Sequence, residues 1–153
     1  MIELYRAHRP DIRLAPNVMA TLEELRRRAV DLALISDGST RHQRAKIEAL
    51  GLSEFFAPEA ILISEETGGD KHTDIPWQRA EQLFGTDGRR FFYVGDNIAK
   101  DFRRPRMRGW HTVMLLNTAN TNVFPQQPRD WPAECLPDTT LTDIADLLSF
   151  STL

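Results

Sequence analysis

The sequence has 153 residues and a mass of 17.5 kDa, with 41% hydrophobic and 27% charged residues, which is the composition of one ordinary soluble domain. Its 19 basic and 22 acidic residues leave a net charge of −3, which argues against nucleic acid as a partner. There is one cysteine, Cys135, and no apolar run long enough to span a membrane, so we expect no disulfide, no membrane partner and a cytoplasmic location.

Strand and helix patterns alternate along the amino-terminal half, which is typical of a parallel sheet with crossover helices. Asn17 is a favourable residue to cap the first helix, and an arginine triplet at residues 26–28 ends it. Gly51 occupies the position that favours a left-handed cap after the second helix. In chain order we expect a helix from Asn17 to Arg28, a strand at Val30–Ile35, a helix at Thr40–Leu50 and a strand at Ala60–Ser64.

The carboxyl-terminal half continues the alternation. Asp74 is a plausible helix cap after a polar loop at residues 65–73, and Pro105 must disturb a later helix. Four prolines between residues 117 and 138 predict a long irregular loop. The expected elements are a helix from Asp74 that buries Trp77, Ala80, Leu83 and Phe84, strands at Phe91–Val94 and His111–Leu116, and a short amphipathic helix at Leu141–Leu148.

Polar residues follow the predicted strands in an order that indicates a site. Ser36 follows the first strand, Lys71 lies in the loop after the second, and Asp96 and Asp101 follow the third. Ligands of open parallel sheets bind at the carboxyl ends of the strands. A hydroxyl and an ammonium group can hold phosphate oxygens, and two carboxylates can hold Mg²⁺. Each residue alone has an ordinary explanation as a turn, cap or surface residue, and their order is what indicates function.

This arrangement resembles the haloacid dehalogenase superfamily of hydrolases. Leu34–Gly38 is similar to its second motif, a strand ending in a phosphate-binding Ser or Thr, and Val94–Phe102 contains its fourth motif, Gly-Asp-x-x-x-x-Asp, whose acids bind Mg²⁺. Lys71 is similar to the lysine of the third motif, which steadies the charge on nucleophile and phosphate. The resemblance implies these site residues: Ser36, Asp37 and Gly38 for phosphate, Lys71 for catalysis, Asp96 and Asp101 for Mg²⁺, and Asn97 as a further candidate.

The family's first motif, Asp-x-Asp, supplies its nucleophile, and it does not occur before Ser36. Only Asp11 and Asp31 precede Ser36, and neither belongs to such a motif. We therefore expect a single domain over residues 1–153: a three-layer α/β fold with a Rossmann-like parallel sheet that lacks the family's first strand and most of its cap. Residues 1–16 resemble a remnant of the return from cap to core.

The resemblance implies a phosphatase-type hydrolase for a small phosphorylated substrate with Mg²⁺, inactive as this isolated chain because the nucleophile is absent. Two alternatives stay open: a non-catalytic protein that binds a phosphorylated ligand, and a subunit completed by another chain. The absent strand is central in the family, between the strands ending at Ser36 and Asp96. The gap could close by direct pairing, by filling with Ile2–Tyr5, or by strand exchange in a homodimer, and we expect one of the last two.

Overall fold

The computed structural model describes residues 10–118 and 126–150, in which helices alternate with parallel strands. None of its helices in these ranges has the length and apolar character that a membrane span requires. The elements are α2 (Pro16–Arg27), β1 (Leu34–Ser36), α3 (Thr40–Ala49), β2 (Ile61–Ile63), α4 (Ser64–Thr67), α5 (Ile75–Phe84), β3 (Phe92–Gly95), α6 (Arg103–Met107), β4 (His111–Leu115), β5 (Thr139–Leu141) and the 3₁₀-helix η5 (Ile144–Ser149).

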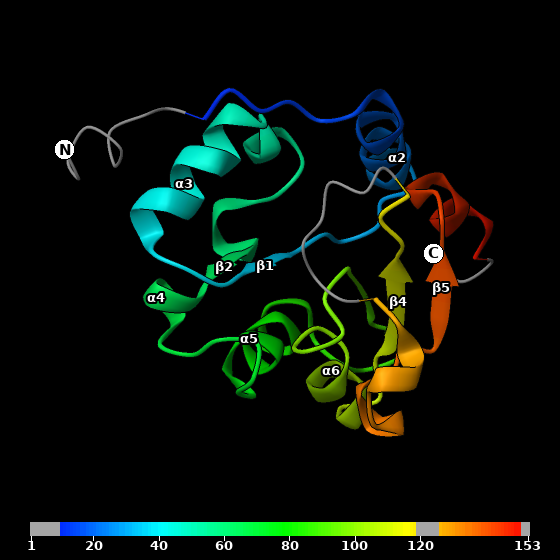
Figure 1. The fold of residues 1–153 in the computed structure, drawn as a ribbon. Coiled ribbons are helices and arrows are strands. Elements are labelled where there is room, and N and C mark those ends of the chain that lie inside the picture. The colour runs from blue at the N-terminus through cyan, green and yellow to red at the C-terminus, as the bar shows by residue number, and fades with distance from the viewer. Residues whose placement is uncertain (1–9, 119–125, 151–153) are drawn as a thin grey trace, which may run out of the picture.

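The strands form two parallel sheets that are not hydrogen-bonded to each other in the described residues. β1 pairs with β2, and β3, β4 and β5 form a second sheet in that order. Figure 1 shows β1 and β2 lying apart from β4 and β5. Direct closure of the gap, with β1 paired to β3, is therefore not the arrangement adopted. The expectation that Ile2–Tyr5 fills the gap lies outside the described residues.

Side chains alternate along the strands and thereby build a core on each face of the first sheet. On one face Ile61 and Ile63 of β2 pack with Leu22 of α2 and Ile47 of α3. On the other face Leu62 packs with residues of α5 and of the second sheet. The domain thus has helices on both sides of its strands, which is the three-layer α/β architecture expected from the sequence.

Trp77 of α5 joins the two sheets. Its side chain is fully buried, and its ring meets Tyr93 of β3 edge-on at 4.8 Å and Trp110, just before β4, at 5.5 Å. Leu62 and Ile35 of the first sheet belong to the same cluster. Aromatic pairs in this geometry stabilise a core beyond the area that they bury. The expectation that α5 buries Trp77 is therefore confirmed.

Two of the expected helix details are wrong. Asn17 does not cap the first helix, because Pro16 begins it at a position where proline's missing N–H costs nothing. Asn17 lies inside that helix and donates to Asp143 Oδ1 at 3.0 Å. Leu83 is 39% exposed and not buried, since it points away from the face of α5 that carries Trp77. Part of the expected polar loop at residues 65–73 is the short helix α4.

The last elements also differ from expectation. The helix expected at Leu141–Leu148 is replaced by β5, which pairs with β4, and by the 3₁₀-helix η5. The β-branched residues Thr139 and Thr140 favour a strand, and the exposed edge of β4 provides its partner. The strand expected at Val30–Ile35 is shorter, because β2 offers only three partner residues. In the proline-rich segment, residues 128–130 and 133–135 form single 3₁₀ turns.

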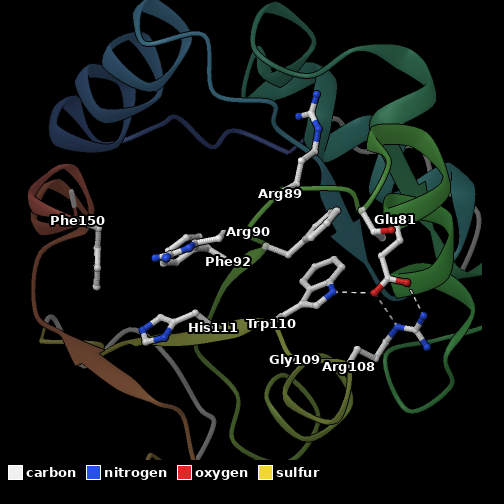
Figure 2. A pocket seen from close by; sticks show the side chains of 11 residues that line it. Glu81, Arg89, Arg90, Phe92, Arg108, Gly109, Trp110, His111 and Phe150 are labelled. Carbon is white, nitrogen blue, oxygen red and sulfur yellow. Dashed lines mark hydrogen bonds and ion pairs between the residues drawn. The ribbon is translucent and has the colours of Figure 1, made fainter. Parts of the chain in front are cut away.

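Glu81 links α5 to the start of β4, as Figure 2 shows. Its carboxylate accepts hydrogen bonds from Arg108 Nε at 3.0 Å and from Trp110 Nε1 at 2.9 Å. The hydrogen bond from Arg108 is the main reason why the pKa of Glu81 lies below its usual value of 4.5, and that from Trp110 lowers it further. Burial opposes both effects.

We predict that Glu81→Gln lowers the free energy of unfolding at pH 7 by about 1–2 kcal/mol, because it removes charge-assisted hydrogen bonds at a partly buried site. The folded pKa of Glu81 is depressed, so this contribution is complete above the unfolded pKa of about 4.5 and is lost as the pH falls through the lower folded value. Urea unfolding between pH 3 and 7 measures it. Glu59→Gln, at an exposed glutamate, is the control and should show no such dependence.

Candidate functional site

The carboxyl ends of β1, β2 and β3 place polar residues at one edge of the domain. Ser36 is the last residue of β1, Ser64 directly follows β2, and Asp96 directly follows β3. Because β1 and β2 are parallel, their carboxyl ends share one edge of the first sheet. Hydrogen bonds and ion pairs connect the two sheets there, as described below. This edge is where the sequence predicts the site.

The carboxylate of Asp101 makes the most contacts at this edge. Its side chain is 1% exposed, and Oδ2 accepts the backbone N–H groups of Asp96 at 3.0 Å and Asn97 at 2.9 Å. Oδ1 accepts a hydrogen bond from Lys71 Nζ at 2.8 Å and faces the hydroxyl of Tyr93 at 3.4 Å. Both oxygens of this buried charge are therefore satisfied, which burial of a carboxylate requires.

Lys71 lies between Asp101 and the ring of Tyr93. Its side chain is 12% exposed, and Nζ sits 5.4 Å from the ring centroid, which is within cation–π range. Burial, and then the negative charge of Asp101, raise the pKa of the Tyr93 phenol well above its usual value. Tyr93 is thus a neutral hydrogen-bond donor at physiological pH, and the ammonium group is fixed from two sides.

A second ion pair crosses from the first sheet to the second. Asp37, the residue after β1, accepts Lys100 Nζ on Oδ2 at 2.9 Å, and Lys100 follows β3. Oδ1 of Asp37 accepts the backbone N–H of Lys71 at 3.1 Å. Asp37 therefore connects the loops after β1, β2 and β3, and the structure brings it together with Lys71 and Asp101 in one cluster.

The turn after β1 is held by side chains of the neighbouring helices α3 and α4. The hydroxyl of Ser36 donates to Gln43 Oε1 of α3 at 3.0 Å, and the backbone N–H of Gly38 donates to Ser64 Oγ at 2.9 Å. Gly38 has φ 137°, a conformation that strongly favours glycine, and a Cβ there would lie 2.6 Å from Gln43 Nε2. The described contacts of Ser36 do not include Lys71 or the acidic residues after β3.

The turn after β3 is shaped around Asp101. A Cβ at Gly95 would lie 2.5 Å from Asp101 Oδ2, so only glycine lets the backbone approach the carboxylate this closely. Asn97 is buried, and its Oδ1 accepts the backbone N–H of Ala99 at 3.0 Å. Asp96 is exposed at the end of the strand. Asn97 therefore holds the turn, which begins at the exposed Asp96.

The acidic residues present do not fit a magnesium centre by themselves. In residues 10–118 and 126–150, no three His, Cys, Asp or Glu side chains lie close enough together to hold a metal ion. Asp37 and Asp101 each use both oxygens for lysine and backbone donors. Mg²⁺ prefers near-octahedral oxygen ligation. We therefore derive no step of this chain's chemistry from a bound Mg²⁺ ion.

Three residues that make contacts at this edge were not predicted to do so from the sequence: Lys100, Gln43 and Ser64. Lys100 lies within the Gly-Asp-x-x-x-x-Asp stretch, at a position that the motif leaves open. Ser64 directly follows β2 at the same edge as Ser36, so its place after a predicted strand could have indicated that it belongs to the site. Gln43 lies one turn into α3, seven residues after Ser36, and no motif indicates its contact.

Comparisons with known proteins agree on one family for this chain. Residues 5–103 match the model of haloacid dehalogenase-like hydrolases. The chain is 32% identical over 134 residues to phosphoserine phosphatase of Thermus thermophilus, which covers 88% of this chain and 49% of that protein. It is 30% identical over 111 residues to ribulose-1,5-bisphosphate 5-phosphatase of Halopiger xanaduensis, which covers 72% of this chain and 46% of that protein. The chain thus spans about half the length of these relatives.

Solved structures share the fold. A HAD phosphatase from Thermococcus onnurineus superposes with a TM-score of 0.71 at 18% identity, over 89% of this chain and 57% of that one. A 2-haloacid dehalogenase from Pseudomonas syringae superposes with a TM-score of 0.68 at 23% identity, over 96% of this chain and 56% of that one. At these identities the likeness concerns the fold alone, and it agrees with the α/β architecture described above.

We predict that Asp101→Asn lowers the free energy of unfolding by about 3–5 kcal/mol, because removal of one partner leaves the ammonium group of Lys71 buried without its counter-charge. The NH2 group of the new amide would also face either the Lys71 ammonium or the two backbone N–H groups, and both of these are donors. Urea denaturation at pH 7 measures the change, and Asp87→Asn, at an exposed loop aspartate, is the matched control. Equal stability of the two variants would contradict the role given to Asp101.

Proposed function

The chain belongs to the haloacid dehalogenase-like hydrolase family, and from this premise we propose that it is a phosphatase-type domain whose carboxyl edge binds the phosphoryl group of a small phosphorylated molecule. Relatives named for dephosphorylating phosphoserine and ribulose-1,5-bisphosphate support the substrate class. Ser36, Asp37, Gly38 and Lys71 are the residues proposed for phosphate, and Asp96, Asp101 and Asn97 form the neighbouring acidic turn.

One observation carries this proposal: two lysines from different loops converge with Asp37 and Asp101 at the carboxyl edge. Lys71 and Lys100 are both held by carboxylates within 2.9 Å, and their side chains are 12% and 28% exposed. Two positioned ammonium groups, one of them paired with the residue that follows Ser36, are suited to phosphate oxygens. Lys71 would stabilise charge on the phosphoryl group, and the Ser36 hydroxyl would donate to one of its oxygens after release from Gln43.

The same geometry predicts weak binding. Two ammonium groups and the carboxylates of Asp37, Asp96 and Asp101 sum to a charge of −1, so an arriving phosphate anion meets no net attraction from the group as a whole. Hydrogen bonds to charged groups contribute about 1.5–3 kcal/mol each, so Ser36 and Lys71 together supply roughly 3–6 kcal/mol before ordering costs. Because an affinity of 1 mM corresponds to about 4.1 kcal/mol, we expect millimolar affinity or weaker.

Hydrolysis through a covalent intermediate needs a nucleophile. The family's nucleophile belongs to an Asp-x-Asp motif, and these 153 residues contain no such motif, since no two of their aspartates are separated by one residue. Asp37 is a poor substitute. Its two oxygens accept the Lys100 ammonium and the Lys71 backbone N–H, which lowers the reactivity of the carboxylate. We therefore propose that this chain alone binds a phosphoryl group without turning it over.

A second candidate function is supported by the separation of the two sheets. A subunit that is completed by another polypeptide would leave strands unpaired until the partner binds, and β1 and β3 are not paired with each other. Such a protein could bind a phosphorylated ligand or partner without catalysis. Oligomeric assembly by strand exchange, proposed from the sequence, belongs to this alternative.

Phosphate titration tests the proposed function. We predict that inorganic phosphate binds the 153-residue chain with a dissociation constant of about 1 mM or weaker, and that Lys71→Ala abolishes the chemical-shift changes of residues 36–38 that accompany binding. The same protein should hydrolyse aryl phosphates with Mg²⁺ no faster than buffer. Turnover that Asp37→Asn abolishes would show that Asp37 is a nucleophile after all, and phosphate shifts elsewhere on the protein would refute the site.

Calorimetry with Mg²⁺ tests the metal separately. Because Asp37 and Asp101 are engaged by lysines and backbone donors, we predict no binding tighter than about millimolar. A micromolar affinity that disappears in Asp96→Ala would contradict this prediction and would restore Asp96 and Asp101 as metal ligands. Asp87→Ala serves as the control for a general loss of surface charge.

A further inference from the structure

A cavity of about 570 Å³ lies at the amino-terminal ends of β3 and β4 (Figure 2). Phe92, the first residue of β3, and His111, the first residue of β4, both line it. Asp96 follows the other end of β3, four residues from Phe92, which corresponds to about 13 Å along a strand. The volume lies within the range of about 300–1,000 Å³ that is usual for small-molecule sites. The cavity is therefore separate from the candidate site and large enough for a ligand of its own.

Three aromatic rings that line this cavity pack against one another. The ring centroids of Phe92 and His111 lie 5.3 Å apart, and each lies 5.7 Å from that of Phe150. A hydrogen bond of 2.9 Å between His111 Nε2 and Thr139 Oγ1 fixes the imidazole. All three residues are half-buried, so part of their surface stays open. Because each ring is held by the other two, the cavity offers a preformed aromatic surface.

A second aromatic pair lines the same cavity. The ring of Phe91 stacks on that of Trp110, with the centroids 4.7 Å apart and an angle of 24° between the planes. The indole N–H of Trp110 donates to Glu81, so it is already used. Small-molecule sites are lined mainly by apolar and aromatic side chains, with a few polar groups that fix the orientation of the ligand. The rings supply the apolar lining, and the polar groups are arginines.

Three arginines line the cavity, and one of them carries an uncompensated charge. Arg89 is paired with Asp31, and Arg108 is paired with Glu81. Within residues 10–118 and 126–150, Arg90 makes no ion pair or hydrogen bond. A guanidinium group cannot lose its charge in a protein. The three arginines and the two carboxylates therefore leave one positive charge at this cavity, although the whole chain has a net charge of −3.

The free guanidinium group and the aromatic surface lie on the same side of the cavity. In Figure 2 the side chains of Arg90, Phe92 and His111 all extend toward the side on which Phe150 lies. We propose that the cavity binds a small aromatic carboxylate, with its ring against Phe92, His111 and Phe150 and its carboxylate paired with Arg90. Such a ligand covers the open aromatic surface and supplies the negative charge that Arg90 lacks.

The single free charge favours a carboxylate over a phosphate. A carboxylate has one negative charge, and its two oxygens match two parallel N–H groups of a guanidinium group. A phosphate monoester carries a charge of about −1.5 to −2 at pH 7, which Arg90 alone would not balance. Arg89 and Arg108 add little, because carboxylates of the protein already bind them. The proposal uses none of the residues proposed for the phosphoryl group.

The test is an NMR titration of the full 153-residue chain with 2-naphthoate. We predict a dissociation constant of about 1 mM or tighter, with chemical-shift changes at Phe92, Trp110, His111 and Phe150 and none at residues 36–38. The neutral 2-naphthamide has nearly the same shape but no charge. It should bind at least about tenfold more weakly, because it cannot form the charge-assisted hydrogen bonds to Arg90.

Matched variants separate the charge from the rings. Arg90→Gln should weaken 2-naphthoate binding by about tenfold or more, whereas Arg41→Gln, at an exposed arginine of α3 outside the cavity, should leave it unchanged. Phe150→Leu should weaken binding by about three- to tenfold for both naphthyl ligands, since it removes a ring that each of them contacts. If a variant does not fold, the comparison with 2-naphthamide decides the question on the unaltered protein.

Each other outcome overturns the proposal. Equal affinity for 2-naphthamide would identify a plain apolar pocket, and tighter binding of 2-naphthyl phosphate at the same residues would identify a phosphate site. An equal loss in Arg41→Gln would show general attraction to a basic surface. Absence of saturable binding would show that Arg90 is a solvated surface residue. Shifts at residues 36–38 would place the ligand at the candidate site instead. Phosphate binding there can succeed or fail independently of all these results.

Discussion

The two sheets of this domain are held together by side chains, because their facing strands β1 and β3 are not hydrogen-bonded to each other. On one face Trp77 packs against residues of both sheets. At the carboxyl edge, Lys100 and Asp37 form an ion pair between the loops after β3 and β1, and Lys71 pairs with Asp101. The packing of Trp77 and the two ion pairs hold the sheets at their spacing, and hence position the groups of the site.

The properties of the site follow from this constraint. Carboxylates that would otherwise be available for a cation or for attack on phosphorus are used to hold the halves of the domain together. The lysines that suit a phosphate are likewise committed to carboxylates. A group of charges that satisfy one another is stable but nearly neutral, so it attracts an added ion weakly. Completion of the sheet would change this balance by bringing new groups to the same edge.

The sequence was informative where the local pattern and the global fold agree. The alternation of elements, the helix over residues 40–49 and the left-handed Gly51 are confirmed, because each depends on contacts close in sequence. The strand Thr139–Leu141 was missed because it depends on the distant edge of β4. At the site, the positions of Lys71 and Asp101 could be predicted from the order of the strands. The ion pair of Asp37 with Lys100 could not, because it depends on how the two sheets are spaced, and no sequence motif indicates that spacing.

The most direct test of this account is an NMR measurement of hydrogen bonds across the gap in the isolated chain. Scalar couplings through hydrogen bonds report each donor and acceptor pair individually. The account predicts such couplings between β1 and β2 and between β3 and β4, and none between residues of β1 and residues of β3. Couplings that join Leu34–Ser36 directly to Phe92–Gly95 would show a closed sheet and would contradict it.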